Sequence, residues 1–90
     1  MIIMAVDYGD VRTGLAVCDK NEILASPVAV ITESDRERLI EKIIDYARER
    51  QAEAFVVGLP KNMDGSEGFR AEACREFAGM LAEKSGLEIQ

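Results

Sequence analysis

The stretch that decides the fold is MIIMAVDYGDVRTGLAV, residues 1–17. Its apolar and β-branched run at residues 2–7 is typical of a buried strand, yet the run ends on the carboxylate of Asp7. Residues 8–12 (YGDVR) carry turn-forming types, and residues 13–19 (TGLAVCD) return to the pattern of a strand. Because a connection this short joins antiparallel strands, the stretch predicts a hairpin with Asp7 at the end of its first strand.

A third strand and a helix follow the hairpin. Residues 23–31 (ILASPVAVI) extend it to an antiparallel meander, bent at Pro27 because proline cannot donate a hydrogen bond to a neighbouring strand. Ser34, followed three residues later by Glu37, fits a capping box and predicts that a helix begins there. The helix continues through an apolar stripe formed by Leu39, Ile40, Ile43, Ile44 and Ala47.

The second half of the chain predicts a strand, a helix and the start of another strand. Residues 54–58 (AFVVG) are all apolar, as in a central strand covered on both faces. A helix is predicted from about Phe69 to Lys84 with Gly86 as its C-cap, and residues 87–90 begin a further strand. This order predicts an α/β fold, in which a meander and βα units form one mixed sheet with helices packed on it.

Length and composition restrict the class of protein. The 90 residues allow one small domain, and no apolar run reaches the length of a membrane span. No basic segment precedes the first apolar run, so a signal peptide is not expected. Cys18 and Cys74 lie far apart, which argues against a disulfide framework or a zinc site and favours a reducing cytoplasm. The absence of histidine excludes histidine-dependent chemistry. The net charge of −6 is evidence against nucleic-acid binding, which usually requires a basic surface.

Asp7 is the first candidate for chemistry. At the C-terminal end of a central strand it would lie where α/β sheets bind ligands, and if buried it would need a cation, a metal or hydrogen-bond donors. The alternative is an Asx-turn in which Asp7 accepts from the amide of Gly9 or Asp10, and local spacing alone favours it. Gly9 would supply a positive φ or let a phosphate approach closely, and Arg12 would bind a phosphate or be solvated.

The loop at residues 58–66 (GLPKNMDGS) is the second candidate. It follows a buried strand and precedes a helix, so it would share one sheet edge with Asp7 if the two strands are parallel neighbours. Its lysine, its asparagine and the amides at the helix N-terminus suit an anion. The alternative is an ordinary strand-to-helix loop with Ser66 as the N-cap.

Together, DYGDVRTG at residues 7–14 and VVGLPKNMDGS at residues 56–66 resemble the YqgF/RuvX family, whose members are similar to the Holliday junction resolvase RuvC and share the RNase H-like fold. The resemblance covers essentially the whole chain and implies one RNase H-like domain at residues 1–90. The family continues with another strand, an Asp-Glu-Arg motif and a final helix with a further aspartate. The resemblance therefore implies a domain that is incomplete at its C-terminus, and the 90 residues alone are expected to be inactive.

The resemblance also implies roles for individual residues. RNase H-like nucleases use an aspartate on the first strand as catalytic carboxylate and metal ligand, and Asp7 occupies that position. In such enzymes two Mg²⁺ or Mn²⁺ ions, held by clustered carboxylates, activate water and stabilise the leaving oxygen. The residues expected at the substrate are Gly9, Arg12, Lys61, Asn62, Asp64 and Gly65.

Three functions are compatible with these patterns. The leading hypothesis is a metal-dependent nuclease that processes the 5′ end of precursor 16S ribosomal RNA or resolves branched DNA, with structured RNA as the first choice. The acidic charge and the missing carboxylates favour a non-catalytic nucleic-acid-binding or assembly module instead. A third hypothesis is a phosphotransfer domain of the actin/Hsp70 type, whose Asp-x-Gly turn binds ATP phosphates. A homodimer through the exposed strand edge at residues 56–60 is a further hypothesis.

Overall fold

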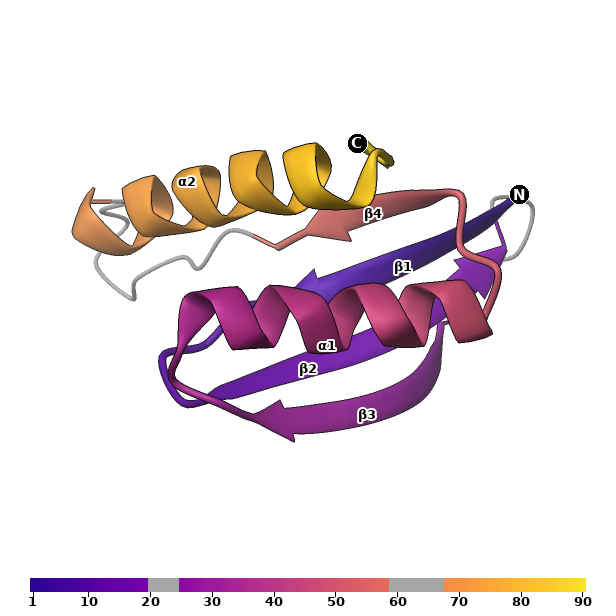
Figure 1. The fold of residues 1–90 in the computed structure, drawn as a ribbon, viewed down its shortest axis with the longest axis horizontal. Helices are drawn as coiled ribbons and strands as arrows, with labels where there is room; N and C mark the ends of the chain where they lie inside the picture. Colours follow the sequence, from indigo (N-terminus) through magenta and orange to yellow (C-terminus); the bar gives the residue numbers. More distant parts are fainter. Residues whose placement is uncertain (20–24, 59–67) are drawn as a thin grey trace.

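The computed structural model describes residues 1–19, 25–58 and 68–90 (Figure 1). In chain order the elements are β1 (Ile2–Asp7), β2 (Arg12–Asp19), β3 (Ser26–Thr32), α1 (Arg36–Glu49), β4 (Ala54–Val57), α2 (Gly68–Ser85) and β5 (Glu88–Ile89). The predicted order of strands and helices is therefore confirmed. Neither of the two helices in this part of the chain is long and apolar enough to cross a membrane.

The strands form one mixed sheet in the order β3-β2-β1-β4-β5. β1 pairs antiparallel with β2, which places Asp7 opposite Gly14, and β2 pairs antiparallel with β3. On its other side β1 pairs in parallel with β4, so that Val6 lies opposite Val57. The meander predicted from the first third of the sequence is confirmed, and β1 lies at the centre of the sheet.

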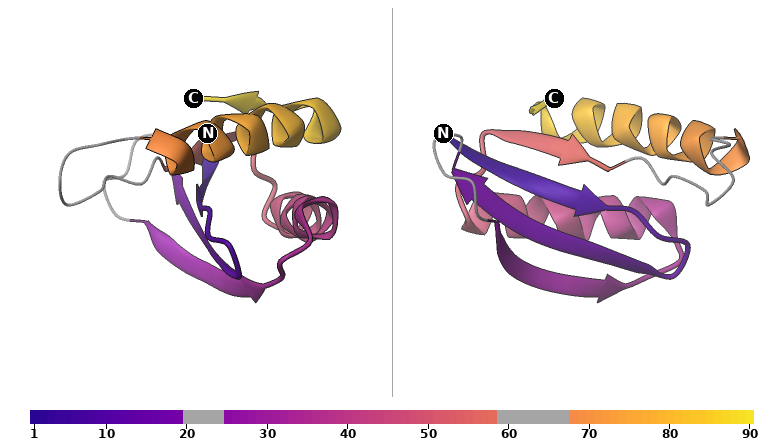
Figure 2. Two further views of the ribbon diagram at one scale, coloured as in Figure 1. Left: turned by 90° about the vertical axis from the view of Figure 1, so that its left-hand side faces the viewer. Right: turned by 180° about the vertical axis from the view of Figure 1, so that it is seen from behind.

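Both helices cover the same face of the sheet. The connections through α1 and α2 advance across the sheet in the same direction, so two right-handed crossovers bring both helices to one side. In the left-hand view of Figure 2, α1 is seen end-on beside the sheet. Side chains from the sheet and from both helices share one core cluster, whose fully buried members include Met4, Ile40, Ile43, Phe55, Phe77 and Leu81.

The N-terminus of α1 differs from the prediction by one residue. Asp35 is the N-cap, and its carboxylate accepts hydrogen bonds from the amides of Glu37 at 2.9 Å and Arg38 at 3.2 Å. The prediction of a capping box that starts at Ser34 is therefore wrong. An aspartate caps as well as a serine does, and its negative charge also interacts favourably with the positive end of the helix dipole.

The C-terminus of α2 follows the prediction. Gly86 has a φ of +73°, a left-handed conformation that glycine adopts without strain. Its amide donates to the carbonyl of Ala82 at 2.9 Å, which satisfies one of the last free carbonyls of the helix. The predicted C-cap at Gly86 is confirmed.

The two edges of the sheet are irregular or short. On β3 the register shifts, so that Leu15 faces Ala29 while Ala16 faces Pro27, which agrees with the predicted bend at the proline. At the opposite edge β5 pairs with only the first two residues of β4, Ala54 and Phe55. Self-association through this edge stays a prediction.

The second face of the sheet carries no helix among the described residues. On β4, Phe55 points into the core and is 0% exposed, whereas Val56 points to the other face and is 37% exposed. The prediction that β4 is covered on both faces is therefore wrong for this part of the chain. An all-apolar run is typical of a doubly covered strand, but here both crossovers deliver their helices to the same side.

Candidate active site

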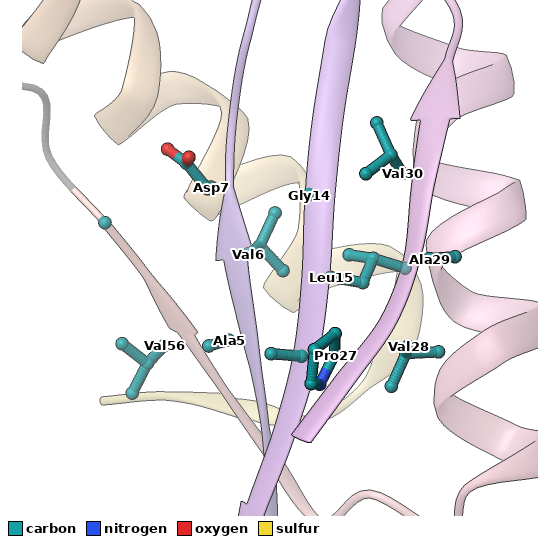
Figure 3. A pocket seen from close by; sticks show the side chains of 12 residues that line it. Ala5, Val6, Asp7, Gly14, Leu15, Pro27, Val28, Ala29, Val30 and Val56 are labelled. Atoms are coloured by element: carbon teal, nitrogen blue, oxygen red, sulfur yellow. The ribbon is translucent and has the colours of Figure 1, made fainter. Parts of the chain in front are cut away.

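Asp7 ends the central strand on the face opposite the helices. Met4 and Val6 point into the core, so the alternation of a strand turns Ala5 and Asp7 the other way (Figure 3). The Asp7 side chain is exposed. Among the described residues it has no hydrogen-bond or ion-pair partner. Because the carboxylate stays hydrated, a strand that is otherwise apolar carries it without the cost of burying a charge.

The turn after Asp7 is closed by a different residue. The amide of Gly9 donates to Oγ1 of Thr13 at 3.4 Å, and Thr13 is 0% exposed. The Asx-turn alternative is therefore not observed in the described part of the chain. Sequence reasoning missed Thr13, although a hydroxyl side chain inside an apolar strand was the signal that could have found it.

Gly9 is required by a close approach of the backbone. Its φ is not positive, which excludes one of the two roles considered from the sequence. A β-carbon at this position would overlap the carbonyl oxygen of Arg12 across the hairpin. The glycine therefore allows β1 and β2 to connect tightly directly after Asp7.

Arg12 lies on the same face and at the same end of the sheet as Asp7. It is exposed at the first residue of β2 and pairs with Thr32 of β3. Because Gly14 lies opposite Asp7 and is two residues from Arg12, the three residues share one face. A phosphate contact by Arg12 stays a prediction.

The chain leaving β4 also begins beside Asp7. The amide of Gly58 donates to the carbonyl of Val6 at 3.0 Å. β1 and β4 are parallel neighbours, so the condition on which the shared edge depended is met, and the first residue of the loop lies beside Asp7. The predicted substrate-binding residues Lys61, Asn62, Asp64 and Gly65, and the predicted N-cap Ser66, lie outside the described residues.

A hollow of about 590 Å³ lies on the face of the sheet opposite the two helices, called the open face below. Asp7 is among its lining residues (Figure 3). Small and apolar side chains from four strands form most of its lining, including Ala5, Ala16, Pro27, Val30 and Val56. Val30 is 69% exposed. The surface next to Asp7 therefore contributes shape and apolar contact, and among the described residues that line it Asp7 is the only acidic one.

The described residues supply only part of a metal site. Mg²⁺ and Mn²⁺ prefer oxygen ligands, and the exposed carboxylate of Asp7 is a suitable one. A two-metal centre requires several such groups close together. Within the described ranges, no group of three or more acidic, cysteine or histidine side chains could hold an ion. These residues therefore do not fit a complete two-metal centre.

Comparison with known proteins matches the sequence of this chain to one family. The family model "RuvX: Holliday junction resolvase" covers residues 1–90. A relative from Rhodopirellula baltica, named "Putative pre-16S rRNA nuclease", is 44% identical over 85 residues, 94% of this chain and 49% of the relative. A relative of the same name from Halothermothrix orenii is 43% identical over 90 residues, 100% of this chain and 64% of the relative. The chain thus spans between 49% and 64% of the length of these two relatives.

Solved structures show the same fold at low identity. RuvC of Thermus thermophilus, in complex with a Holliday junction substrate, superimposes with a TM-score of 0.63 at 15% identity, covering 99% of this chain and 62% of that one. The ethanolamine utilization protein EutJ of Carboxydothermus hydrogenoformans gives a TM-score of 0.59 at 23% identity, covering 99% and 35%.

The mixed sheet with an aspartate at the end of its central strand defines an α/β protein of the RNase H-like fold, the class that includes RuvC. Within that class, the chain belongs to the RuvX family.

Proposed function

We propose that this chain is the Asp7-bearing part of a cytoplasmic, divalent-metal-dependent nuclease that hydrolyses phosphodiester bonds in structured nucleic acid. The observation that carries the proposal is the exposed Asp7 carboxylate. It has no partner among the described residues and lies at the end of the central strand, beside Gly58. A carboxylate that makes no hydrogen bond or ion pair with the described residues is available to a cation or a substrate.

The proposed roles follow from position. Asp7 would be one oxygen ligand of Mg²⁺ or Mn²⁺, which when bound supplies an activated water and charge stabilisation. Arg12, on the same face, would contact a phosphate, and Lys61, Asn62, Asp64 and Gly65 would contact the substrate from the loop. Residues 1–90 would lie in one RNase H-like domain, in which Asp7 is one of several carboxylates that hold the metal ions.

The first-choice substrate is the 5′ end of precursor 16S ribosomal RNA. This choice is supported by the name that the 44% and 43% identical relatives carry. A four-way DNA junction is the alternative substrate, supported by the family description and by the Holliday junction bound in the RuvC complex.

A non-catalytic binding or assembly module is the second candidate function. It is favoured by the net charge of −6 and by the incomplete set of metal ligands within the described residues. A phosphotransfer domain is a third candidate, favoured by the Asp-x-Gly pattern at residues 7–9.

The test compares cleavage by this chain with cleavage by a chimera. In the chimera, residues 1–90 are joined to the part of the H. orenii relative that follows its matched segment. Both proteins are incubated with Mn²⁺ and either a precursor 16S RNA fragment or a four-way DNA junction. Asp7→Asn is the test variant, and Asp45→Asn, an exposed aspartate on α1, is the matched control.

Cleavage by the chimera that is lost in Asp7→Asn and retained in Asp45→Asn would support the proposal, and the preferred substrate would identify the role. Binding without cleavage, unchanged by Asp7→Asn, would reject it in favour of the binding module. Binding of ATP in place of nucleic acid would favour the phosphotransfer domain. Circular dichroism of each variant verifies that it is folded.

A further inference from the structure

Tyr8 follows Asp7 directly, and its side chain takes the opposite direction. It is partly buried and packs against the core cluster on the helix side of the sheet. Its ring stacks on that of Phe77 in α2, with the centroids 4.1 Å apart and the planes 4° from parallel. Phe77 is itself 0% exposed, so the ring on which Tyr8 rests is held in the core.

The hydroxyl of Tyr8 connects the same turn to α1. Arg36, the first residue of α1, shares a side-chain hydrogen bond with Tyr8, and this bond is the main reason that the pKa of Arg36 is raised. Nη1 of Arg36 also lies 3.5 Å from a carboxylate oxygen of Glu76 and 3.9 Å from the sulfur of Met80, both on α2. One guanidinium thus joins the Asp7 turn, the start of α1 and the middle of α2.

The rest of the turn is also held by its neighbours. The carbonyl of Val11 accepts a hydrogen bond from the amide of Glu33 at 2.8 Å, at the junction between β3 and α1. The amide of Gly9 donates to Thr13. Asp7, in contrast, makes no side-chain hydrogen bond or ion pair with any described residue. Its direction is therefore set by its place at the end of β1, opposite Gly14, and by the contacts that hold the residues after it.

We propose that Tyr8 is a positioning residue, whose stack on Phe77 and bond to Arg36 fix the backbone after β1 and so aim the Asp7 carboxylate. The role in catalysis rests on the proposed function, because it matters for cleavage only if Asp7 is catalytic. The positioning itself is a property of the fold, and it can be measured in the 90-residue chain without any nuclease activity.

The experiment uses two variants of Tyr8 and one matched control. Tyr8→Phe keeps the ring stack and removes the bond to Arg36, and it is expected to fold because the shape is preserved. Tyr8→Leu removes the stack as well. Tyr46→Phe changes a tyrosine of α1 that is also partly buried against the core but is far from the turn in sequence.

Amide hydrogen exchange at Gly9 reports the order of the turn, and exchange at Phe55 reports the sheet. We expect exchange at Gly9 to accelerate about threefold in Tyr8→Phe, the size of one net hydrogen bond. In Tyr8→Leu we expect exchange at Gly9 to accelerate about tenfold, because the free energies of the aromatic pair and of the hydrogen bond are both lost. The exchange rate at Phe55 should stay within about twofold of its value in the parent chain, as expected for a substitution that does not touch the sheet. Unchanged exchange at Gly9, or equal acceleration at both residues, would overturn the proposal.

The kinetic consequence is measured separately in the chimera. If the chimera cleaves, Tyr8→Leu should lower kcat while KM stays within about twofold. The substitution is expected to change the orientation of the Asp7 carboxylate and not the affinity for the substrate. Tyr8→Phe should fall between Tyr8→Leu and the parent, and Tyr46→Phe should equal the parent. If Asp7→Asn has no effect on cleavage, the proposed function fails, while the exchange result still decides whether Tyr8 positions the turn.

Discussion

The two faces of β1 carry different kinds of side chain. Met4 and Val6 point toward the helices and are 0% and 1% exposed. Ala5 and Asp7 point to the open face, where the side chain is small or charged. The packed face contributes the stability of the fold, so the open face carries an exposed carboxylate at little energetic cost. A central strand can in this way serve as both structural core and chemical site, because its side chains alternate.

The largest effect is expected from comparing adjacent residues on the two faces of β4. Phe55→Ala removes a side chain that is 0% exposed and should lower the free energy of unfolding by about 3–5 kcal/mol. Val56→Ala, on the open face, should change it by about 0.5 kcal/mol or less. Urea denaturation measures both. Equal losses would show that the open face is packed, and the contrast between the faces would then be wrong.

The second prediction concerns the turn that joins β1 to β2. Gly9→Ala forces a methyl group against the carbonyl of Arg12 and should cost about 1–3 kcal/mol. Gly79→Ala is the matched control, because Gly79 is in a helix and, among the described residues, nothing outside the nearby helix backbone lies within 4 Å of the added β-carbon. That control should stabilise the protein by about 0.5–1 kcal/mol, because alanine has a higher helix propensity than glycine. Thermal denaturation of both variants would contradict the steric argument if the two shifts had the same sign.

The third prediction tests how the helix layer begins beside the turn. Asp35→Ala removes the side chain that caps α1 and should cost about 1 kcal/mol. Ser34→Ala, one residue earlier, should have almost no effect, because the described hydrogen bonds to the first helical amides come from Asp35. Denaturant midpoints distinguish the two, and the reverse ranking would restore the capping box expected from the sequence.

The smallest effect is a pH dependence at the same junction. The pKa of Glu33 is lowered, first by its hydrogen bond with the Lys42 ammonium at 3.0 Å and then by its bond from the amide of Asp35. Because the folded pKa is depressed, this contribution to stability is present above the unfolded pKa and is lost as pH falls through the folded pKa. Exposure of the Lys42 side chain keeps it small.

Carbon-13 titration of the Glu33 carboxyl measures this shift directly. Lys42→Gln should return the pKa of Glu33 toward its ordinary value and weaken the loss of stability on acidification. Lys42→Arg keeps the positive charge and should retain most of the depression. An unchanged pKa in Lys42→Gln would show that the lysine is not its cause.

Sequence patterns alone were sufficient to predict the order of the elements, the hairpin whose first strand ends on Asp7, and the cap at Gly86. These features depend on periodicity, on turn residues and on connection length, all of which are local. The same patterns indicated Asp7, Gly9 and Arg12 as site residues, and the structure brings them to one end of the sheet.

The covered face of the sheet could not be predicted from local patterns, because it depends on the direction in which both crossovers advance across the sheet. The structure also explains why residue 9 is a glycine, because a β-carbon there would overlap the carbonyl oxygen of Arg12 across the hairpin. The cluster of Tyr8, Phe77 and Arg36 has no local sequence signal, because its members come from the turn after β1, from α2 and from α1, which are far apart in sequence. Packing brings such residues together, and no short-range pattern records it.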